Sequence, residues 1–504
     1  MQALTDLMLE GRPVQHHRPW QRATVDPKVW ASATVALADG HWTLLGLWGE
    51  TNTVHMALLE EPTGTIGVIT LEGLEGGYPS VAQYHPPALR PERAIHDLVG
   101  LVAQGLPDPR PWLDHGRWGL RFPLGGCLPP APETAPYAFL RSEGDSLHQI
   151  PVGPVHAGII EPGHFRFTAN GETIVRLEER LGYVHKGIEA LMAGASLDRA
   201  AQLAGRTSGD STVAYAYAFS RAVEAAIQLE VPPRAVWLRA LMAEFERLAN
   251  HLGDIGAICN DAAFSLMHTH CGVLRERVLR ASDTAFGHRL MRDRIKPGGV
   301  TADLGHAGTA ALRAVATEIG QTFPLLVELY DNTASLQDRT VGTGVLRPDL
   351  ARQYGAGGYV GRASGRGFDT RRALGYPPYN SLLFEIPVLN EGDVNARVWI
   401  RIREIEQCLS LIAQILDQLP VGPVCIDIPD IAETREGLAL AEGFRGDVLV
   451  WLRLTENGRI DRCHLRDPSW FQWPLLEAAI ENNIVADFPL CNKSFNCSYS
   501  GHDL

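Results

Sequence analysis

Two stretches of the sequence place acidic and basic side chains at helical spacing. In YVHKGIEALM, His185 and Glu189 are four residues apart, so on a helix they would share one face and could relay a proton. In EFERLANHLGD, Glu244, Arg247 and His251 follow one another at spacings of three and four. From spacing alone a solvated helix face is the commoner interpretation of both patterns, although a helical bundle could bury the second as an ion pair.

Two further stretches offer ligand and capping chemistry. The run MHTHC brings His268 and His270 next to a cysteine, but no fourth metal ligand follows at a usual spacing. The loop GRTSGDSTVAYA contains Ser208, Asp210 and Ser211, whose oxygens are typical acceptors for the first amides of a helix. The plain expectation is therefore a capped helix that begins just after this loop.

Glycine and arginine are concentrated in two later loops, 339–344 and 355–372. Neither lies in a strand–loop–helix context with a following acidic residue, so a dinucleotide-binding motif is excluded. Irregular backbone pressed against a partner or cofactor, with Arg362 and Arg371 as buried charges, and an ordinary surface loop are equally good interpretations.

The elements that must position these residues differ between the two parts of the chain. Residues 41–48, 53–59 and 65–71 are short apolar runs that predict a strand meander. A helix opened by Pro91 follows, with Ile95, Leu98, Val99 and Val102 on one face.

The second part begins with a hairpin and continues with long helices. Asn170-Gly171 separates two β-like runs and is a strong hairpin signal. The stretch 213–229 is apolar nearly all round and is expected deep in a core. Further helices are expected at about 233–254, in LRERVLRASDTAF, from about 309, and in VNARVWIRIREIEQCLSLIAQILDQL, which together favour a bundle.

Composition and charge narrow the class of protein. The chain has 504 residues and a net charge of −13, which argues against a general nucleic-acid binder. Apolar runs such as 408–416 are too short to span a bilayer, and the N-terminus lacks the features of a secretory signal. The eight cysteines include no CxxC pair and are expected to be mostly buried thiols. We therefore expect a cytoplasmic protein.

Several segments, taken in order, match one known family. They are ERAIHDLVGLVAQGLPDPRPW in the first part and, in the second, GPVHAG, EPGHFRF, GYVHKGIE, EFERLANHLGD, KPGGVTADL, DRTVGTG, GRASG with DTR, and EGDVNAR. On these motifs the chain resembles the large subunit of group 4, membrane-bound NiFe hydrogenases of the formate-hydrogenlyase and hydrogenase-4 kind. That protein is similar to the C and D subunits of complex I fused into one polypeptide. One departure is Ala94, where the family usually has a second glutamate.

The resemblance implies an α+β fold in two parts. Residues 1–125 would form a small α+β domain like the C subunit of complex I. Residues 126–150, rich in proline and glycine, would be a linker. Residues 151–504 would form a large, mainly helical domain with small β hairpins, like the D subunit of complex I and the hydrogenase large subunit.

The same resemblance implies that the nickel–iron ligands are missing. Members with the metal hold it with two cysteine pairs, and these positions correspond here to Ser208 and Ser211 in RTSGDST and to Ser498 and Gly501 in NCSYSGHDL. Hydroxyl groups bind nickel weakly compared with thiolates. No metal site is therefore expected in this chain.

Other family positions are partly retained. Glu189 matches a glutamate that hydrogenases use as a proton gate, and Arg362, Asp369 and Arg371 match residues that line the same cavity. With His185 they form the predicted proton path.

The quinone-binding pair of complex I is displaced in this sequence. Its tyrosine position falls on Gly209 and its histidine position near Ile160. His156 and Tyr183 are nearby polar residues that could form a rearranged quinone pocket.

The leading hypothesis is a hydrogenase-like subunit of a membrane-associated, energy-converting redox complex. It would bind no cofactor itself and would face three kinds of partner on the cytoplasmic face of the membrane. These are a small iron–sulfur subunit like the B subunit of complex I, a ferredoxin-like iron–sulfur subunit, and antiporter-like membrane subunits. Electrons would reach an unidentified acceptor, with a quinone as one candidate, while protonation changes pass to the membrane arm.

Three alternatives to this hypothesis remain open. The first is a quinone reductase subunit as in NADH-quinone oxidoreductase, and the second is a purely structural subunit. The third is a hydrogenase with Cys491 and Cys497 as unusual ligands.

Overall fold

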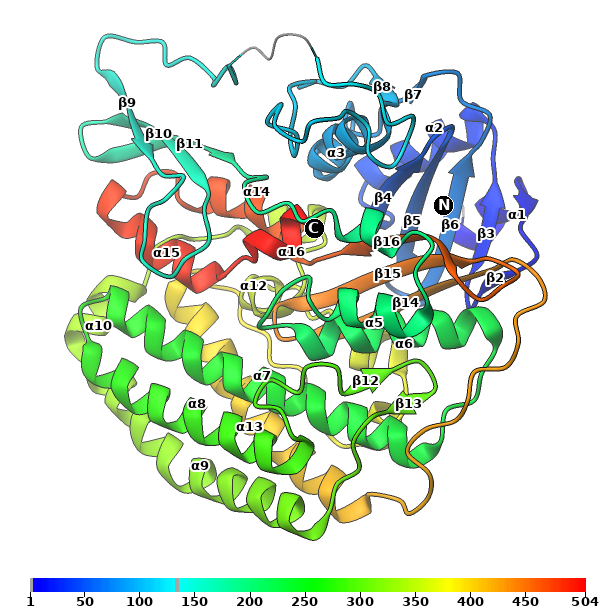
Figure 1. Ribbon diagram of the computed structural model, residues 1–504. Helices are drawn as coiled ribbons and strands as arrows, with labels where there is room; N and C mark the ends of the chain where they lie inside the picture. The colour runs from blue at the N-terminus through cyan, green and yellow to red at the C-terminus, as the bar shows by residue number, and fades with distance from the viewer. Residues whose placement is uncertain (1–2, 132–135) are drawn as a thin grey trace.

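The computed structural model describes residues 3–131 and 136–504, and it combines several β-sheets with a bundle of long helices (Figure 1). A mixed helix and sheet fold is thus confirmed. Of the predicted linker 126–150, residues 132–135 lie outside the described residues, and the limits of the predicted domains stay a prediction.

The first part of the chain forms a five-stranded sheet in the order β1-β3-β6-β5-β4. The three predicted strands are confirmed as the antiparallel meander β4 (Thr43–Glu50), β5 (Thr53–Glu60) and β6 (Thr65–Leu71). Strand β3 (Gln21–Thr24) pairs in parallel with β6, and β1 (Arg12–Pro13) pairs antiparallel with β3.

Helices α2 (Pro27–Ala38) and α3 (Leu89–Val99) accompany this sheet. Helix α3 is the helix predicted around Pro91, but Val102 does not share its buried face. Gly100 adopts φ +86° and ends the helix, so Val102 lies half exposed in the next strand. The small elements of this part are α1 (Leu4–Leu9), β7 (Gly77–Pro79) and β8 (Val102–Gln104).

A second sheet, absent from the sequence-based expectation, lies at the centre of the molecule. Its antiparallel strands are β14 (Arg435–Gly443), β15 (Gly446–Leu454) and β16 (Ile460–Arg466). Strand β2 (His17–Arg18) from the first part joins it in parallel with β14. The second part was predicted to contain only small β hairpins, but the structure has a four-stranded sheet there that also includes a strand of the first part.

The two sheets pack against each other through buried apolar side chains of both. The rings of Trp48 on β4 and Trp451 on β15 have centroids 5.4 Å apart at this junction. Helix α6 (Thr212–Ile227) covers the other side of the second sheet (Figure 1). It is buried nearly all round, as its composition predicted.

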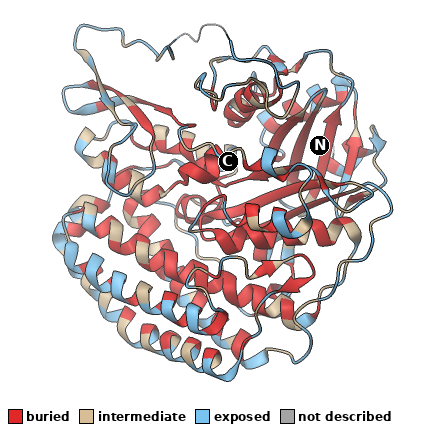
Figure 2. Ribbon diagram, viewed as in Figure 1, coloured by how far each residue is buried: buried red, intermediate tan, exposed pale blue. Residues whose placement is uncertain are grey.

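Long helices α7 (Pro233–Asp261), α8 (Ser265–Phe286), α9 (His306–Asn332) and α13 (Val394–Gln418) form the predicted bundle. Helix α7 lies inside and is buried over most of its length, whereas α8 and α9 expose one side to solvent (Figure 2). The largest apolar cluster of the protein fills the space between these helices.

A three-stranded sheet and the C-terminal helices complete the fold on the remaining side. The predicted hairpin is confirmed as β10 (His164–Asn170) and β11 (Thr173–Arg180), and β9 (Leu147–Val152) extends it. The other elements are α4 (Ile188–Met192), α5 (Leu197–Ala204), β12 (Ile295–Lys296), β13 (Gly299–Val300), α10 (Ala334–Thr340), α11 (Pro348–Gln353), α12 (Gly358–Ala363), α14 (Ser469–Ala479), α15 (Phe488–Phe495) and α16 (Tyr499–Asp503).

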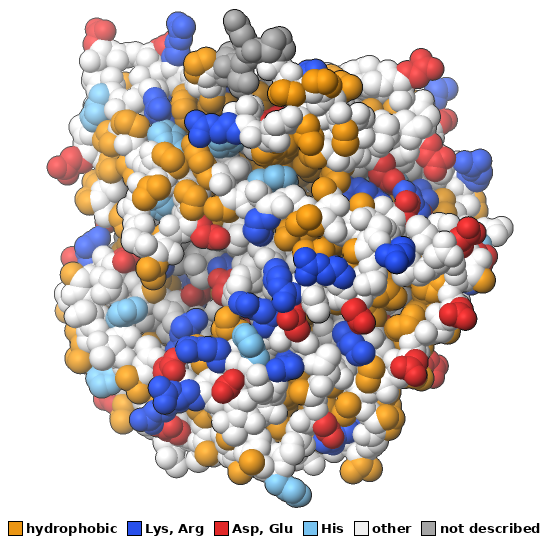
Figure 3. Space-filling view, viewed as in Figure 1, with side chains coloured by type: hydrophobic (Ala, Val, Ile, Leu, Met, Phe, Trp, Pro, Cys, Tyr) orange, Lys and Arg blue, Asp and Glu red, His pale blue; other side chains and the backbone are white. Residues whose placement is uncertain are grey.

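The surface mixes charged and apolar side chains, and on the face shown in Figure 3 lysine and arginine gather across the centre even though the net charge is −13. Within residues 3–131 and 136–504, no helix combines the length and the apolar character needed to cross a membrane.

Candidate functional site

Glu189 lies buried where the five-stranded sheet of the first part meets the sheet of β14, β15 and β16. Its carboxylate accepts hydrogen bonds from Arg462 Nη1 at 2.8 Å, from His464 Nδ1 at 2.9 Å and from the Leu465 amide at 3.0 Å. Burial alone would raise the pKa of Glu189, but Arg462 and His464 hold it at about 2. Glu189 is therefore a fixed anion at neutral pH.

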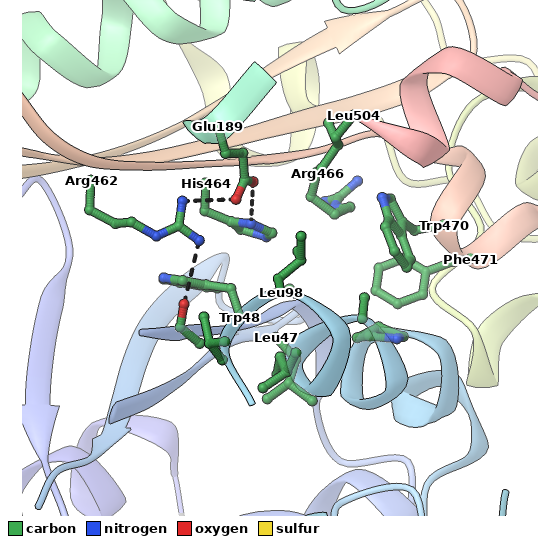
Figure 4. Close-up of a pocket in the computed structure, with 16 residues that line it drawn as sticks. Leu47, Trp48, Leu98, Glu189, Arg462, His464, Arg466, Trp470, Phe471 and Leu504 are labelled. Carbon is green, nitrogen blue, oxygen red and sulfur yellow. Dashed lines mark hydrogen bonds and ion pairs between the residues drawn. The ribbon is translucent and has the colours of Figure 1, made fainter. Parts of the chain in front are cut away.

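A narrow cavity opens beside this carboxylate (Figure 4). It is lined by β4 and α3 of the first part and by Glu189, β16, α14 and Leu504 of the second part. Arg462, His464 and Trp48 lie at one end in the figure, and Trp470 and Phe471 lie at the other. The cavity has a volume of about 30 Å³, which is room for about two water molecules.

The predicted helical pair of His185 and Glu189 is wrong. Helix α4 begins only at Ile188, so His185 lies in the preceding loop. Its Nδ1 donates to the Asp503 main-chain oxygen at 2.6 Å and its ring stacks on Trp118. The histidine that binds Glu189 is His464, 275 positions further along the chain, which no local pattern could indicate.

The four positions assigned to missing metal ligands come together in the fold. Ser208 Oγ lies 3.0 Å from Ser498 Oγ, and the Gly501 amide donates to Ser498 Oγ at 2.9 Å. Ser208 and Ser211 both donate to the Asp210 carboxylate. We call Ser208, Ser211, Ser498 and Gly501 the serine cluster.

An ion pair closes this serine cluster. Arg445 binds both oxygens of Asp210, at 2.8 and 2.6 Å, and also donates to Ser211 Oγ. Burial would raise the pKa of Asp210, but Arg445 holds it at about 2. The hydroxyls are thus engaged with each other and with charged neighbours.

The predicted side-chain cap at this loop is only half right. Ser211 is the residue before α6, but its hydroxyl makes no capping bond to the helix. Glu246 on α7 replaces it and accepts from the Val213 and Ala214 amides at 2.7 and 3.0 Å. A buried carboxylate from another helix satisfies these first amides, since they would otherwise be unpaired.

Arg362, Asp369 and Arg371 lie in a buried ion network rather than in the cavity beside Glu189. Arg362 contacts three carboxylates, Glu404 at 2.7 Å, Glu442 at 3.1 Å and Asp369 at 3.3 Å, and Arg371 joins Asp369 to Glu244.

The same network contains Glu244, Arg247 and His251, the three residues spaced along α7. They are buried, so the interpretation of this pattern as a solvent-exposed helix face is wrong. His251 Nε2 lies 2.7 Å from Glu404. Burial would raise the pKa of Glu404, but Arg362 and His251 keep it well below its ordinary value.

His156 and Tyr183, the two residues of the predicted quinone pocket, contact different side chains. His156 contacts Phe165 and Tyr499, with Nε2 3.4 Å from the Tyr499 hydroxyl. Tyr183 is partly exposed and packs edge-on against His115. A quinone pocket built on this pair stays a prediction.

The histidines of MHTHC are exposed on α8, while Cys271 is buried in the bundle. In the described part of the chain, no group of three or more His, Cys, Asp or Glu side chains has an arrangement that could hold a metal ion.

Comparison with known proteins identifies the class. Residues 261–437 match the family described as respiratory-chain NADH dehydrogenase, 49 kDa subunit. The chain is 32% identical to formate hydrogenlyase subunit 5 of Escherichia coli K12 over 436 residues, covering 84% of this chain and 77% of that protein. It is 31% identical to the D subunit of NADH-quinone oxidoreductase from Syntrophobacter fumaroxidans, covering 70% of this chain and 95% of that protein.

A solved structure shows the same fold. It is the membrane-bound sulfane sulfur reductase, an archaeal respiratory membrane complex, one chain of which superposes with a TM-score of 0.67 at 26% identity and covers 72% of this chain and 100% of that chain. The protein therefore belongs to the family that contains the D subunit of NADH-quinone oxidoreductase and formate hydrogenlyase subunit 5.

Proposed function

We propose that this chain is the hydrogenase-like large subunit of a membrane-associated, energy-converting redox complex, and that it works without a nickel–iron centre. It joins the counterparts of the C and D subunits of complex I in one polypeptide. Electrons from an iron–sulfur cluster of a partner subunit reach an acceptor, with a quinone as one candidate, and the associated protonation changes pass to a membrane arm. Relatives named as subunits of such complexes support this proposal.

The observation that carries it is the serine cluster. The residues at its four positions supply hydroxyls at Ser208, Ser211 and Ser498 and no side chain at Gly501, so the donor set does not fit a thiolate-bound nickel. A side chain at position 501 would also meet the Asp467 carboxylate, since a Cβ there would lie 2.4 Å from Asp467 Oδ2. An Asp210–Arg445 ion pair and its hydrogen bonds replace metal coordination at this site.

The neighbouring cysteines give little support to an alternative metal site. Cys491 and Cys497 are buried, and burial raises the pKa of Cys491 to about 11 and that of Cys497 well above its ordinary value. Within the described residues, neither thiol belongs to a group of three or more His, Cys, Asp or Glu side chains that could hold a metal ion. The Cys491 thiol is also packed closely against the backbone at Gly344, where an added Cβ would lie 2.4 Å from Cys491 Sγ.

A purely structural subunit is the second candidate, and the saturation of the serine cluster favours it. Each hydroxyl of Ser208, Ser211 and Ser498 has a protein partner, so the cluster needs no ligand to satisfy it. In this case only contacts with partner subunits would matter.

The proposed partners are a small iron–sulfur subunit, a ferredoxin-like iron–sulfur subunit and antiporter-like membrane subunits, with this chain on the cytoplasmic face of the membrane. The loop between β9 and β10 supports a protein contact there, because Val155 and Ile159 are 84% and 96% exposed. Contiguous exposed apolar patches, rather than single apolar side chains, mark interaction sites, and these two residues lie four positions apart on one loop.

Nickel analysis and infrared spectroscopy of the natively purified complex test the main proposal. We expect nickel far below one atom per chain and no bands of iron-bound CO or cyanide, together with redox-driven ion transport. Stoichiometric nickel with those bands would contradict it. The effect of substitutions in this chain on ion transport separates the two candidates.

The variant Glu189→Gln removes the anion beside the cavity and is expected to reduce transport at least tenfold. Glu406→Gln is a matched control because Glu406 is half exposed on α13. Unchanged transport in Glu189→Gln and Ser208→Ala, in a complex that still assembles, would favour the structural role.

A further inference from the structure

The histidine bound to Glu189 has one ring nitrogen without a protein partner. His464 Nδ1 lies 2.9 Å from Glu189 Oε1, and an ionised carboxylate can only accept, so Nδ1 carries the proton. The neutral ring then presents a free lone pair at Nε2. This atom is buried and has no hydrogen-bond partner within the described residues.

Other buried groups around the same cavity are also unpaired. Trp48 Nε1, Arg462 Nε and Trp470 Nε1 are N–H donors of cavity-lining residues, and none has a hydrogen-bond partner in the part of the chain that the structure describes. Buried polar atoms in proteins are nearly always hydrogen-bonded, to protein or to ordered water. The residues that carry these three donors and the His464 acceptor all line the cavity of about 30 Å³, which has room for water, and water both donates and accepts.

A second histidine–carboxylate pair on the facing sheet provides a contrast. His55 Nε2 lies 2.8 Å from Glu50 and His55 Nδ1 lies 2.9 Å from the Thr70 hydroxyl, so both ring nitrogens are satisfied. The two imidazoles stack on the same indole, Trp48, with centroids 4.9 Å away for His464 and 5.2 Å away for His55. Protein atoms satisfy both ring nitrogens of His55, whereas His464, which lines the cavity, keeps Nε2 without a protein partner in the described residues.

We propose that the Glu189–His464 pair is a proton-accepting site whose ligand is water held in the cavity between the two sheets. His464 Nε2 takes a proton from a cavity water, and that water regains one from its neighbours towards solvent, so no water is consumed. Glu189 is a positioning residue, because it fixes the ring tautomer and stabilises the imidazolium without being protonated itself. The use of this proton in ion transport rests on the proposed function.

The charges around His464 come from several elements. Glu189 on α4 favours the imidazolium, whereas Arg462 and Arg466 on its own strand oppose it. From the first sheet it stacks on Trp48, whose ring also stacks on His55, the hydrogen-bond partner of Glu50. Burial is the largest influence and lowers the pKa of His464 below 6.5, so the proton is taken up on the acid side of neutrality.

Exchange of the histidine C2 hydrogen with deuterium, followed by mass spectrometry between about pH 4 and pH 9, tests the site in the natively purified complex. The exchange rate of each histidine reports its pKa and its access to water. We expect His464 to exchange along a titration curve with a midpoint below 6.5. His55 is the internal control and is expected to exchange much more slowly at every pH.

The variant Glu189→Gln tests whether Glu189 sets the pKa of His464. Loss of the carboxylate is expected to lower the midpoint for His464 by at least about one pH unit while leaving His55 unchanged. Because the comparison of His464 with His55 needs only the unmutated protein, the site is testable even if the variant fails to assemble. Exchange at His464 as slow as at His55 over the whole pH range would overturn the proposal.

Transport measurements keep this inference distinct from the proposed function. If His464 titrates as expected but His464→Gln leaves the pH profile of ion transport unchanged, the proton-accepting site stands and the proposed proton coupling through it fails. If His464 does not titrate, the site itself is overturned, whatever the transport activity.

Discussion

Replacing Arg362 by methionine is expected to lower the free energy of unfolding by about 3–5 kcal/mol at neutral pH. Arg362 is fully buried and binds Glu404, Asp369 and Glu442. The methionine fills most of the space but removes the one cation that these three buried carboxylates share. Urea unfolding of the purified chain measures the loss.

Arg403→Met on the same helix as Glu404 is the matched control. Arg403 is 56% exposed and pairs with Glu406 at 3.0 Å, so its loss is expected to cost less than about 1 kcal/mol. If Arg362→Met costs no more than this control, the network does not stabilise the fold as its geometry indicates.

The cost of Arg362→Met is also expected to depend on pH. In the native protein the lowered pKa of Glu404 contributes stability that is present above about pH 4.5 and lost as the pH falls. In the variant Glu404, Asp369 and Glu442 each lose one cationic partner, which raises their pKa values, so protonation relieves their burial as the pH decreases. The difference between variant and native protein is therefore expected to be smaller at about pH 5 than at about pH 8.

Replacing Gly437 by alanine is the second change with a large expected effect. A Cβ at this position on β14 would lie 1.9 Å from the Ala222 carbonyl oxygen of α6. Backbone must therefore move, and helix α6 must separate from the central sheet. We expect a loss of about 3 kcal/mol, at the upper end of the usual cost of overpacking, and a lower melting temperature.

Gly320→Ala is the control for this substitution. Gly320 lies inside α9 and a Cβ there meets nothing within 4 Å. The added methyl group favours the helix and is expected to raise stability by about 0.5–1 kcal/mol. If the two substitutions change the free energy of unfolding equally, α6 and β14 are not packed closely enough to exclude a Cβ at position 437.

Local patterns predicted the local structure well. Asn170-Gly171 marked the turn between β10 and β11, and the all-round apolar character of α6 indicated its central place. The strands β14 to β16 were missed, although the turn around Arg445 and Gly446 separates two apolar runs that could have indicated a hairpin. Their role in the fold depends on contacts with distant segments.

The candidate site was predicted in part, for the same reason. The resemblance indicated Glu189, and the structure places it in a buried polar site. Its partners Arg462 and His464 lie on β16, and only the packing of α4 on that strand brings them together. His185 was chosen because it is near in sequence, but the chain there is not helical.

The pairing of β2 with β14 has a consequence for synthesis of the protein. His17 is made early, but its partner Glu436 leaves the ribosome only after more than about 400 further residues, about 20–80 s later at ordinary translation rates. Until then the apolar face of the first sheet, including Trp48, lacks its cover. The nascent chain is therefore expected to depend on a chaperone for most of its translation, and slowing synthesis should increase aggregation of incomplete chains.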